Sequence, residues 1–324
     1  PFPHSSTSVA YDWTHPIDQI VQSKLDKLNI TPSGRCSDAD FVRRVSLDIT
    51  GLLPSGEVVR DFLADPSPDK RTTLIDSLLD SPGYAAWWAT RFSDWTGNNA
   101  EQLNNVLPVR DVASRLWYEW LRTRIDGNMP YDEIVEGIVT AQSRQPDETY
   151  LDYCKAMTEA CKPGNEKLFA TRDGLPMYWS RRDFQKPEDR AIGFAYTFLG
   201  IRIECAQCHK HPFDRWSKED FGNFARLFSP IRSNANAVSP EAKDERMQLI
   251  SSITDGEELK GGRLRRSLNA AAKQGKTVPL AELLVNTRSI KAKAKQAARK
   301  NGRNAPMRIP SGKILGELDK ISLE

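Results

Sequence analysis

Apolar residues recur at intervals of three and four along most of this chain, and this spacing constrains the fold more than any other feature. Two such sets would each line one face of a helix: Val58, Val59, Phe62 and Leu63, and Leu74, Ile75, Leu78 and Leu79. The strict alternation that is typical of half-buried strands is scarce throughout. The sequence therefore predicts a mainly α, multi-helical fold.

Turn and cap residues divide this pattern into separate helices. We expect helices to begin at Asp38 or Asp40, at Ser55, at Asp69, at Pro187 and at Lys218. Further helices are expected over residues 84–95, 112–125 and 131–140, and Phe221, Phe224 and Phe228 should face one way in the last helix. The stretch 144–172 is rich in polar residues and is expected to loop out.

The strongest chemical signal is the pentapeptide Cys-Ala-Gln-Cys-His at residues 205–209. Two thiols three residues apart, followed directly by an imidazole, have the spacing that attaches a c-type haem. Cys205 and Cys208 can each add to a haem vinyl group, and His209 can then ligate the iron from the proximal side. We place this haem c-type attachment motif on the helix that begins at Pro187.

Two other kinds of site use cysteine pairs. A dithiol redox pair also begins a helix, but it usually follows a strand, and residues 191–199 have a helical pattern. A zinc ion could take Cys205, Cys208, His209 and His211, but neighbouring ligands would strain a closed tetrahedron. Structural zinc sites usually draw a second ligand pair from farther along the chain, and none is found. The sequence favours one haem c, with a non-haem transition metal as the alternative cofactor.

The signal extends over residues 197–216, which read TFLGIRIECAQCHKHPFDRW. This run closely resembles the signature of a large cytochrome c-like family, abundant in planctomycetes, that is built on a domain of unknown function. Residues 41–54, 84–95 and 128–132 resemble upstream motifs of the same family. The resemblance implies a family domain over residues 16–230. It leaves an N-terminal extension over 1–15 and a basic, partly helical segment over 231–324.

The sixth iron ligand would decide between electron transfer and the binding of small molecules. Met177 lies in a proline-containing segment upstream of the motif and is one candidate, with core packing as its alternative role. His15 is the second candidate. His211 is too close to His209 along the chain to reach the opposite face of the same haem, so we expect it to bind a second metal or to form a hydrogen bond.

Two residues after the motif suit the edge of a haem. The guanidinium of Arg215 matches the geometry of a propionate carboxylate, and a surface ion pair with Asp214 is its alternative role. The indole of Trp216 can donate to the other propionate or pack. The aromatic stripe over residues 84–95 is expected in the core, with a wall of the haem pocket as the other option.

Cysteine usage and the attachment chemistry bear on the compartment. Cys154 and Cys161 are expected to form a small disulfide, with two reduced thiols as the alternative. Covalent haem attachment implies export in bacteria, so we expect a periplasmic or cell-surface protein. No run is long and apolar enough for a transmembrane segment. No signal peptide precedes Pro1, which is either a processed mature terminus or an arbitrary boundary.

The C-terminal segment has a distinct charge. Residues 283–316 contain no acidic residue, and nine basic residues lie between 288 and 313: Arg288, Lys291, Lys293, Lys295, Arg299, Lys300, Arg303, Arg308 and Lys313. This run lacks the aromatic residues that stack on bases, so no nucleic acid is expected. It is either a solvated helix or a docking face for an acidic redox partner or a glycan.

Together these patterns favour a c-type cytochrome-like electron-transfer protein with one haem, serving a redox partner such as a dehydrogenase. The alternative is a non-haem metal-binding or structural module that acts as a scaffold or binding domain in exported polysaccharide degradation. An electron carrier or redox subunit is favoured over a stand-alone enzyme, and no catalytic residue is predicted. Carboxylates such as Asp94, Asp173, Asp183 and Glu188 form no recognisable catalytic pair.

Overall fold

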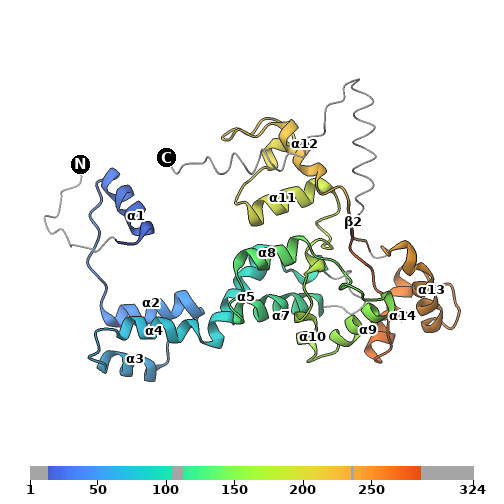
Figure 1. Ribbon diagram of the computed structural model, residues 1–324, viewed down its shortest axis with the longest axis horizontal. Helices are drawn as coiled ribbons and strands as arrows, with labels where there is room; N and C mark the ends of the chain where they lie inside the picture. The colour runs from blue at the N-terminus through green and yellow to red at the C-terminus, as the bar shows by residue number, and fades with distance from the viewer. Residues whose placement is uncertain (1–13, 104–111, 235–236, 286–324) are drawn as a thin grey trace. The chain divides into compact units, whose positions relative to one another are not determined.

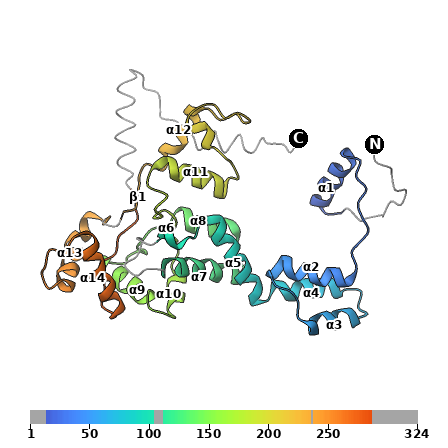
Figure 2. The same ribbon diagram turned by 180° about the vertical axis from the view of Figure 1, so that it is seen from behind.

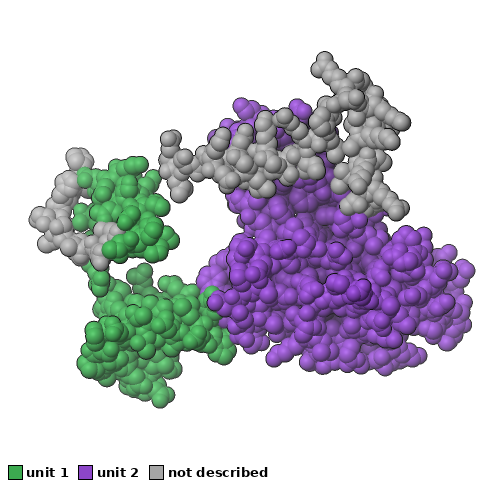
Figure 3. All heavy atoms as spheres, in the orientation of Figure 1, with its two compact units in different colours: residues 1–84 green, residues 85–324 purple. Residues whose placement is uncertain are grey.

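The computed structural model describes residues 14–103, 112–234 and 237–285 (Figure 1). The chain divides into two compact units, residues 1–84 and 85–324, which are coloured separately in Figure 3. Within the described ranges the structure is mainly helical, and its strands are only two residues long. The predicted mainly α, multi-helical fold is confirmed. Across these ranges no helix combines the length and the apolar character needed to span a membrane.

The first unit is built from short helices, and three of them begin directly after a residue whose side chain caps the helix. Its helices are α1 (Pro16–Lys27), α2 (Asp38–Thr50), α3 (Gly56–Ala64) and α4 (Lys70–Leu79). The cap of α2 is Ser37, whose Oγ accepts from the N–H of Asp40 at 3.1 Å, rather than Asp38 or Asp40 as predicted. Gly51 ends this helix in the left-handed conformation, with φ 69°. Helix α2 packs against both α3 and α4.

Helix α5 (Pro82–Thr96) begins at the end of the first unit, and the remaining elements belong to the second. The helices are α6 (Ala100–Leu103), α7 (Val112–Asp126), α8 (Tyr131–Val139), α9 (Tyr150–Ala160), α10 (Glu166–Ala170), α11 (Pro187–Phe198), α12 (Lys218–Arg226), α13 (Lys243–Ile253) and α14 (Gly261–Lys273). Three single turns of 3-10 helix are η1 (Pro176–Tyr178), η2 (Glu204–Gln207) and η3 (Pro240–Ala242). The strands β1 (Ile231–Arg232) and β2 (Leu284–Val285) pair antiparallel, with Ile231 opposite Val285.

Helix α7 forms the centre of the second unit's core. Its two tryptophans, Trp117 and Trp120, are both 0% exposed. A buried indole N–H needs a hydrogen-bond partner, and each one has it. Trp117 Nε1 donates to Thr96 Oγ1 at 3.3 Å, and Trp120 Nε1 donates to the carbonyl of Arg172 at 2.9 Å. These bonds hold α5 and the segment after α10 against α7.

The stretch 144–172, which was expected to loop out, instead contains α9 and α10 and is partly buried. Its polar residues pair with each other inside the fold: the guanidinium of Arg172 donates to both carboxylate oxygens of Glu148. The hydroxyl of Tyr150 donates to the carbonyl of Leu280 at 2.8 Å. The loop prediction, which rested on the many polar residues of this stretch, was wrong because several of these residues have partners inside the fold.

The predicted disulfide between Cys154 and Cys161 is also absent, and both residues are buried free thiols. Cys154 lies inside α9 and Cys161 is the residue that follows its last turn. Seven residues along an α-helix rise by about 10 Å, which is more than a disulfide allows between two Cα atoms. The helix therefore keeps the two sulfurs apart.

A second aromatic cluster joins α11 to α12, which lie side by side in Figures 1 and 2. The ring of Phe228 lies 5.5 Å from that of Phe194 and 5.6 Å from that of Trp179, measured between centroids. Phe221 and Phe228 are buried, and Phe224 packs on Phe194, as the common face predicted for this helix requires. The cluster fixes the two helices that flank the cysteine motif.

The aromatic stripe of α5 is only half-buried, in contrast to the core position predicted for it. Trp95 is 46% exposed, and its ring lies 5.1 Å from that of Phe92 between centroids. The side of α5 that enters the core carries small residues instead, among them Ala85 and Ala89. Small side chains let α5 lie close to its neighbours, so the aromatic residues cover its outer side.

Candidate functional site

The cysteine motif lies on its own short turn rather than on α11. Helix α11 begins at Pro187 as predicted but ends at Phe198, and Gly200 follows with φ 63°. A left-handed residue at this position ends an α-helix. The chain then forms the single turn η2, which carries Cys205, and Cys208 caps that turn. The predicted location on a continuous helix is therefore corrected to a separate turn between α11 and α12.

Both thiols of the motif are exposed. The carbonyl of Cys205 accepts from the backbone N–H groups of Cys208 and His209, each at 3.4 Å. These hydrogen bonds close the turn, so Cys208 and His209 are held one turn after Cys205. A reagent or a cofactor can therefore reach both sulfurs in the folded chain.

The ring of His209 is oriented by its neighbour. Its Nδ1 lies 2.7 Å from the backbone carbonyl of Lys210. A carbonyl oxygen can only accept, so Nδ1 carries the proton and the lone pair of the neutral imidazole is on Nε2. A hydrogen bond of this kind to Nδ1–H is the usual support of a histidine that ligates a metal through Nε2.

His211 is used differently. Its Nδ1 accepts from the backbone N–H of Phe213 at 3.2 Å, and its own backbone N–H donates to the carbonyl of Trp216 at 2.8 Å. The two bonds close a loop over residues 211–216. A hydrogen bond is one of the two roles considered for His211.

A shallow apolar hollow lies beside the motif, between α11, η2 and α12. Its lining includes Leu199, Ile203, Trp216, Phe221 and Phe224. The hollow has a volume of about 20 Å³, room for one water-sized sphere. It supplies an apolar floor next to the cysteines and does not enclose a cofactor.

The loop over residues 211–216 also positions the predicted propionate contacts. The guanidinium of Arg215 lies 5.3 Å from the ring centroid of Trp216. The carboxylate of Asp214, considered from the sequence as an ion-pair partner of Arg215, accepts from the backbone N–H of that residue at 2.6 Å. Phe213 is 95% exposed, so this loop presents a whole aromatic ring to solvent.

Neither candidate distal ligand belongs to the short segment that carries the motif. Met177 lies in η1 and is only 2% exposed, enclosed in the core rather than lining the hollow. His15 belongs to the first unit, where its Nδ1 caps α1 by accepting from the N–H of Ile17 at 3.2 Å. Cys205, Cys208, His209, Arg215 and Trp216 are thus the predicted residues that one short segment brings together. Among the described residues, no three His, Cys, Asp or Glu side chains are arranged to hold a metal ion.

The cysteines should differ sharply in reactivity. Burial raises the pKa of Cys154 to about 11 and that of Cys161 to about 12. At pH 8 a thiol of pKa 11 is ionised in only about one molecule in a thousand, and the thiolate is the reactive form. With Ellman's reagent on haem-free protein, we expect Cys205 and Cys208 to react at least tenfold faster than Cys154 and Cys161.

Replacing Cys205 and Cys208 by serine provides the control, because the fast phase should then lose their two thiols and keep at most the half-buried Cys36, while the slow phase stays. Fast modification of four or more thiols in folded protein would contradict the burial of the α9 pair.

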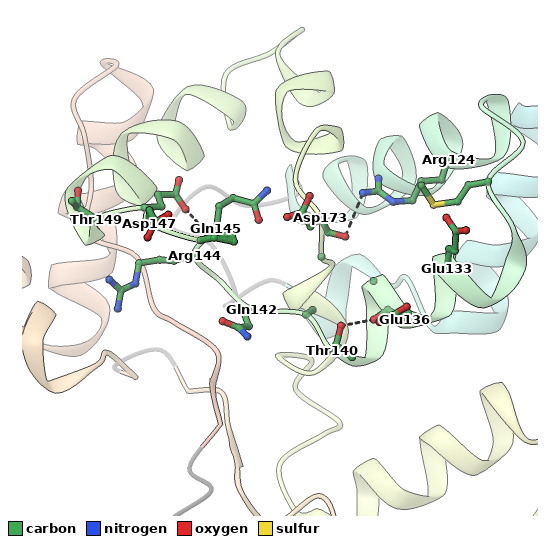
Figure 4. Close-up of a pocket in the computed structure, with 16 residues that line it drawn as sticks. Arg124, Glu133, Glu136, Thr140, Gln142, Arg144, Gln145, Asp147, Thr149 and Asp173 are labelled. Atoms are coloured by element: carbon green, nitrogen blue, oxygen red, sulfur yellow. Dashed lines mark hydrogen bonds between the residues drawn. The ribbon is translucent and has the colours of Figure 1, made fainter. Parts of the chain in front are cut away.

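A polar cleft of about 1210 Å³ was not indicated by any sequence motif (Figure 4). Its lining comes from α7, from α8, from the segments that follow these two helices and from residues 173–174. Asp173, one of the carboxylates without a recognisable partner in the sequence, is among the residues that line it. Residues 173–174 are separated in the chain from the rest of the lining by α9 and α10, so only the folded structure brings them together.

Comparison with known proteins identifies a family but no individual relative. The family model described as PSCyt2, protein of unknown function (DUF1549), matches residues 16–233, which is more than half of the chain. The match contains the cysteine motif, α11 and α12. No curated protein and no solved structure matches the chain.

Proposed function

We propose that this chain, which belongs to the planctomycete-associated PSCyt2 family of proteins of unknown function, is a c-type cytochrome-like electron-transfer protein. It would hold one covalently attached haem. The observation that carries the proposal is the orientation of the His209 ring. Its Nδ1–H donates a hydrogen bond to the Lys210 carbonyl, and its Nε2 keeps a lone pair. Two exposed thiols lie on the same turn.

The donor set fits the cofactor. Cys205 and Cys208 would hold the porphyrin through thioether bonds: each sulfur bonds to one vinyl carbon, and the thiol proton goes to the other. His209 would ligate the iron through Nε2, and the Lys210 carbonyl would keep that nitrogen available. When bound, a haem of this kind supplies a one-electron couple.

The surroundings of the motif support the same proposal. The exposed ring of Phe213 and the apolar hollow lined by Trp216 leave apolar surface that a ligand would cover. Arg215 and Trp216 would contact the propionates from the loop over residues 211–216. For the sixth position the candidates remain Met177 and His15, and a ligand role for Met177 requires η1 to rearrange, because its side chain is enclosed.

The proposal extends to compartment and partners. A chain that receives haem in this way in bacteria would be exported, to the periplasm or the cell surface. It would exchange electrons with a redox partner protein such as a dehydrogenase. The basic run over residues 288–313, considered as a docking face for an acidic partner or a glycan, lies outside the described residues.

The test is expression in a host that attaches c-type haem, followed by intact-protein mass and a pyridine haemochrome spectrum. We expect the mass of one haem and a c-type band, both lost when Cys205 and Cys208 are replaced by alanine. Cys36→Ala is the matched control and should keep the haem. Replacement of His209 by alanine should keep the added mass and the pyridine haemochrome band, in which pyridine supplies the axial ligands. It should change the absorbance spectrum of the native protein, because it removes an iron ligand and not an attachment point.

Protein of haem-free mass from the competent host would overturn the proposal. Metal analysis of the segment 205–211 would then test the alternative, a non-haem metal site in a scaffold or binding domain. Haem mass that survives the double cysteine replacement would show attachment elsewhere and would also contradict the assignment.

A further inference from the structure

The polar cleft of Figure 4 is acidic along its length. Glu133 and Glu136 lie on α8 at one side of the view, Asp147 lies at the other side, and Asp173 lies between them. All four side chains are exposed. The cleft therefore presents several carboxylates that are separated from one another.

The arginines that line this cleft are already engaged. Arg124 is buried and donates to the carbonyls of Ala170 and Arg172 at 3.0 and 2.6 Å, and burial lowers its pKa to about 10. Arg144 forms ion pairs with Glu282 at 2.7 Å and with Glu241 at 3.0 Å. By contrast, the carboxylates of Glu133, Glu136 and Asp147 form no ion pair within the described residues. The cleft thus retains negative charge that the described part of the fold does not balance.

The spacing of these carboxylates indicates the kind of ligand. A single metal ion needs three or more ligands converging on one point, and no such group exists among the described residues. Carboxylates spread along a cleft instead match a chain that carries several separated positive charges.

We propose that the occupant is the basic segment of this same chain, residues 288–313. It carries nine positive charges and no acidic residue. The described chain also leads to the cleft: Glu282 pairs with Arg144 of the lining, and the N–H of Leu283 donates to Ser143 Oγ at 2.7 Å. From Val285, the last described residue, an extended chain reaches about 20 Å by Lys291, enough to enter the cleft.

The energetics favour docking within one molecule over docking between molecules. Each exposed ion pair contributes about 0–1 kcal/mol, so separate molecules would associate weakly. A short tether gives the segment an effective concentration in the millimolar range, which allows several weak pairs to act together. Because exposed charges are screened by salt, the docked segment should be released at high ionic strength.

Zero-length crosslinking of carboxylates to lysines in the full-length chain tests the proposal. At about 20 mM salt we expect crosslinks from Lys291, Lys293 or Lys295 to Glu133 or Glu136, and at about 1 M salt we expect them to be lost. A mixture of isotopically light and heavy protein identifies the links that form within one molecule. Links only between light and heavy copies would overturn docking in cis, as would links that avoid the cleft.

A charge variant provides the second measurement. Glu133→Gln with Glu136→Gln should raise the rate of trypsin cleavage within residues 288–313 at least threefold at low salt, because the docked segment is released. Glu57→Gln with Asp61→Asn removes the same number of carboxylates from the exposed side of α3 and should leave the rate unchanged. Equal cleavage rates in the two variants would contradict the proposal. None of these readouts depends on haem, so failure here leaves the proposed function intact.

Discussion

Replacing Gly97 by alanine is expected to lower the free energy of unfolding by about 3 kcal/mol or more. Gly97 has φ 81°, and a Cβ placed on it would lie 1.6 Å from Nη1 of Arg181. That guanidinium is buried and donates from Nη1 to the carbonyl of Thr96 at 2.9 Å and to that of Gly97 at 3.2 Å. To admit the methyl group it must leave these carbonyls, and a buried cation then loses its hydrogen bonds.

Gly164→Ala is the matched control. Gly164 has φ 87°, close to that of Gly97, but nothing lies within 4 Å of the position that a Cβ would take there. The alanine at this site meets only the backbone penalty of the left-handed conformation, about 1–2 kcal/mol. Urea unfolding followed by circular dichroism measures the free energy of unfolding of both variants. Equal destabilisation would contradict a contribution from the contact with Arg181.

Replacing Glu148 by glutamine is expected to cost about 3 kcal/mol of stability. Glu148 and Arg172 form an ion pair whose side chains are only 13% and 9% exposed. Arg172 also donates to the carbonyl of Ser143 at 2.8 Å and lies 5.5 Å from the ring centroid of Tyr153. Removing the carboxylate charge leaves the guanidinium buried without its counterion, which is the costly way to break such a pair.

Lys155→Gln breaks an exposed pair for comparison. Lys155 and Asp152 lie 3.7 Å apart and are 57% and 58% exposed. Its loss should change the free energy of unfolding by less than about 0.5 kcal/mol. Thermal unfolding of both variants measures the difference, and a Glu148 variant as stable as the Lys155 variant would mean that Arg172 finds solvent or another partner.

Helix positions were largely predictable because they depend on local chemistry. Ser55 caps α3, and Pro187 opens α11, as the sequence indicated. The stretch 144–172 failed because its polar residues are satisfied by partners distant in sequence, such as Glu282 for Arg144. A single sequence does not show whether a charged residue pairs inside the fold or remains in solvent.

The candidate site was predictable in its composition but not in its geometry. The spacing of Cys205, Cys208 and His209 was evident from the sequence, and a hydrogen bond for His211 was among the options considered. The proton position on the His209 ring depends on one backbone carbonyl, which no motif specifies. The acidic cleft matched no sequence motif, and residues 173–174 meet the rest of its lining only in the folded chain.

Helix α11 ends before the cysteine turn, at the left-handed residue Gly200, so the folding of this helix and the chemical modification of the cysteines can occur separately. Since the cysteine turn lies outside α11, its sulfurs can be modified without opening a helix turn or disturbing the ring cluster between α11 and α12. If haem is attached as proposed, its attachment can therefore follow folding. A maturation enzyme would meet a finished scaffold with one short exposed turn, and the timing of modification would not limit how fast the helices assemble.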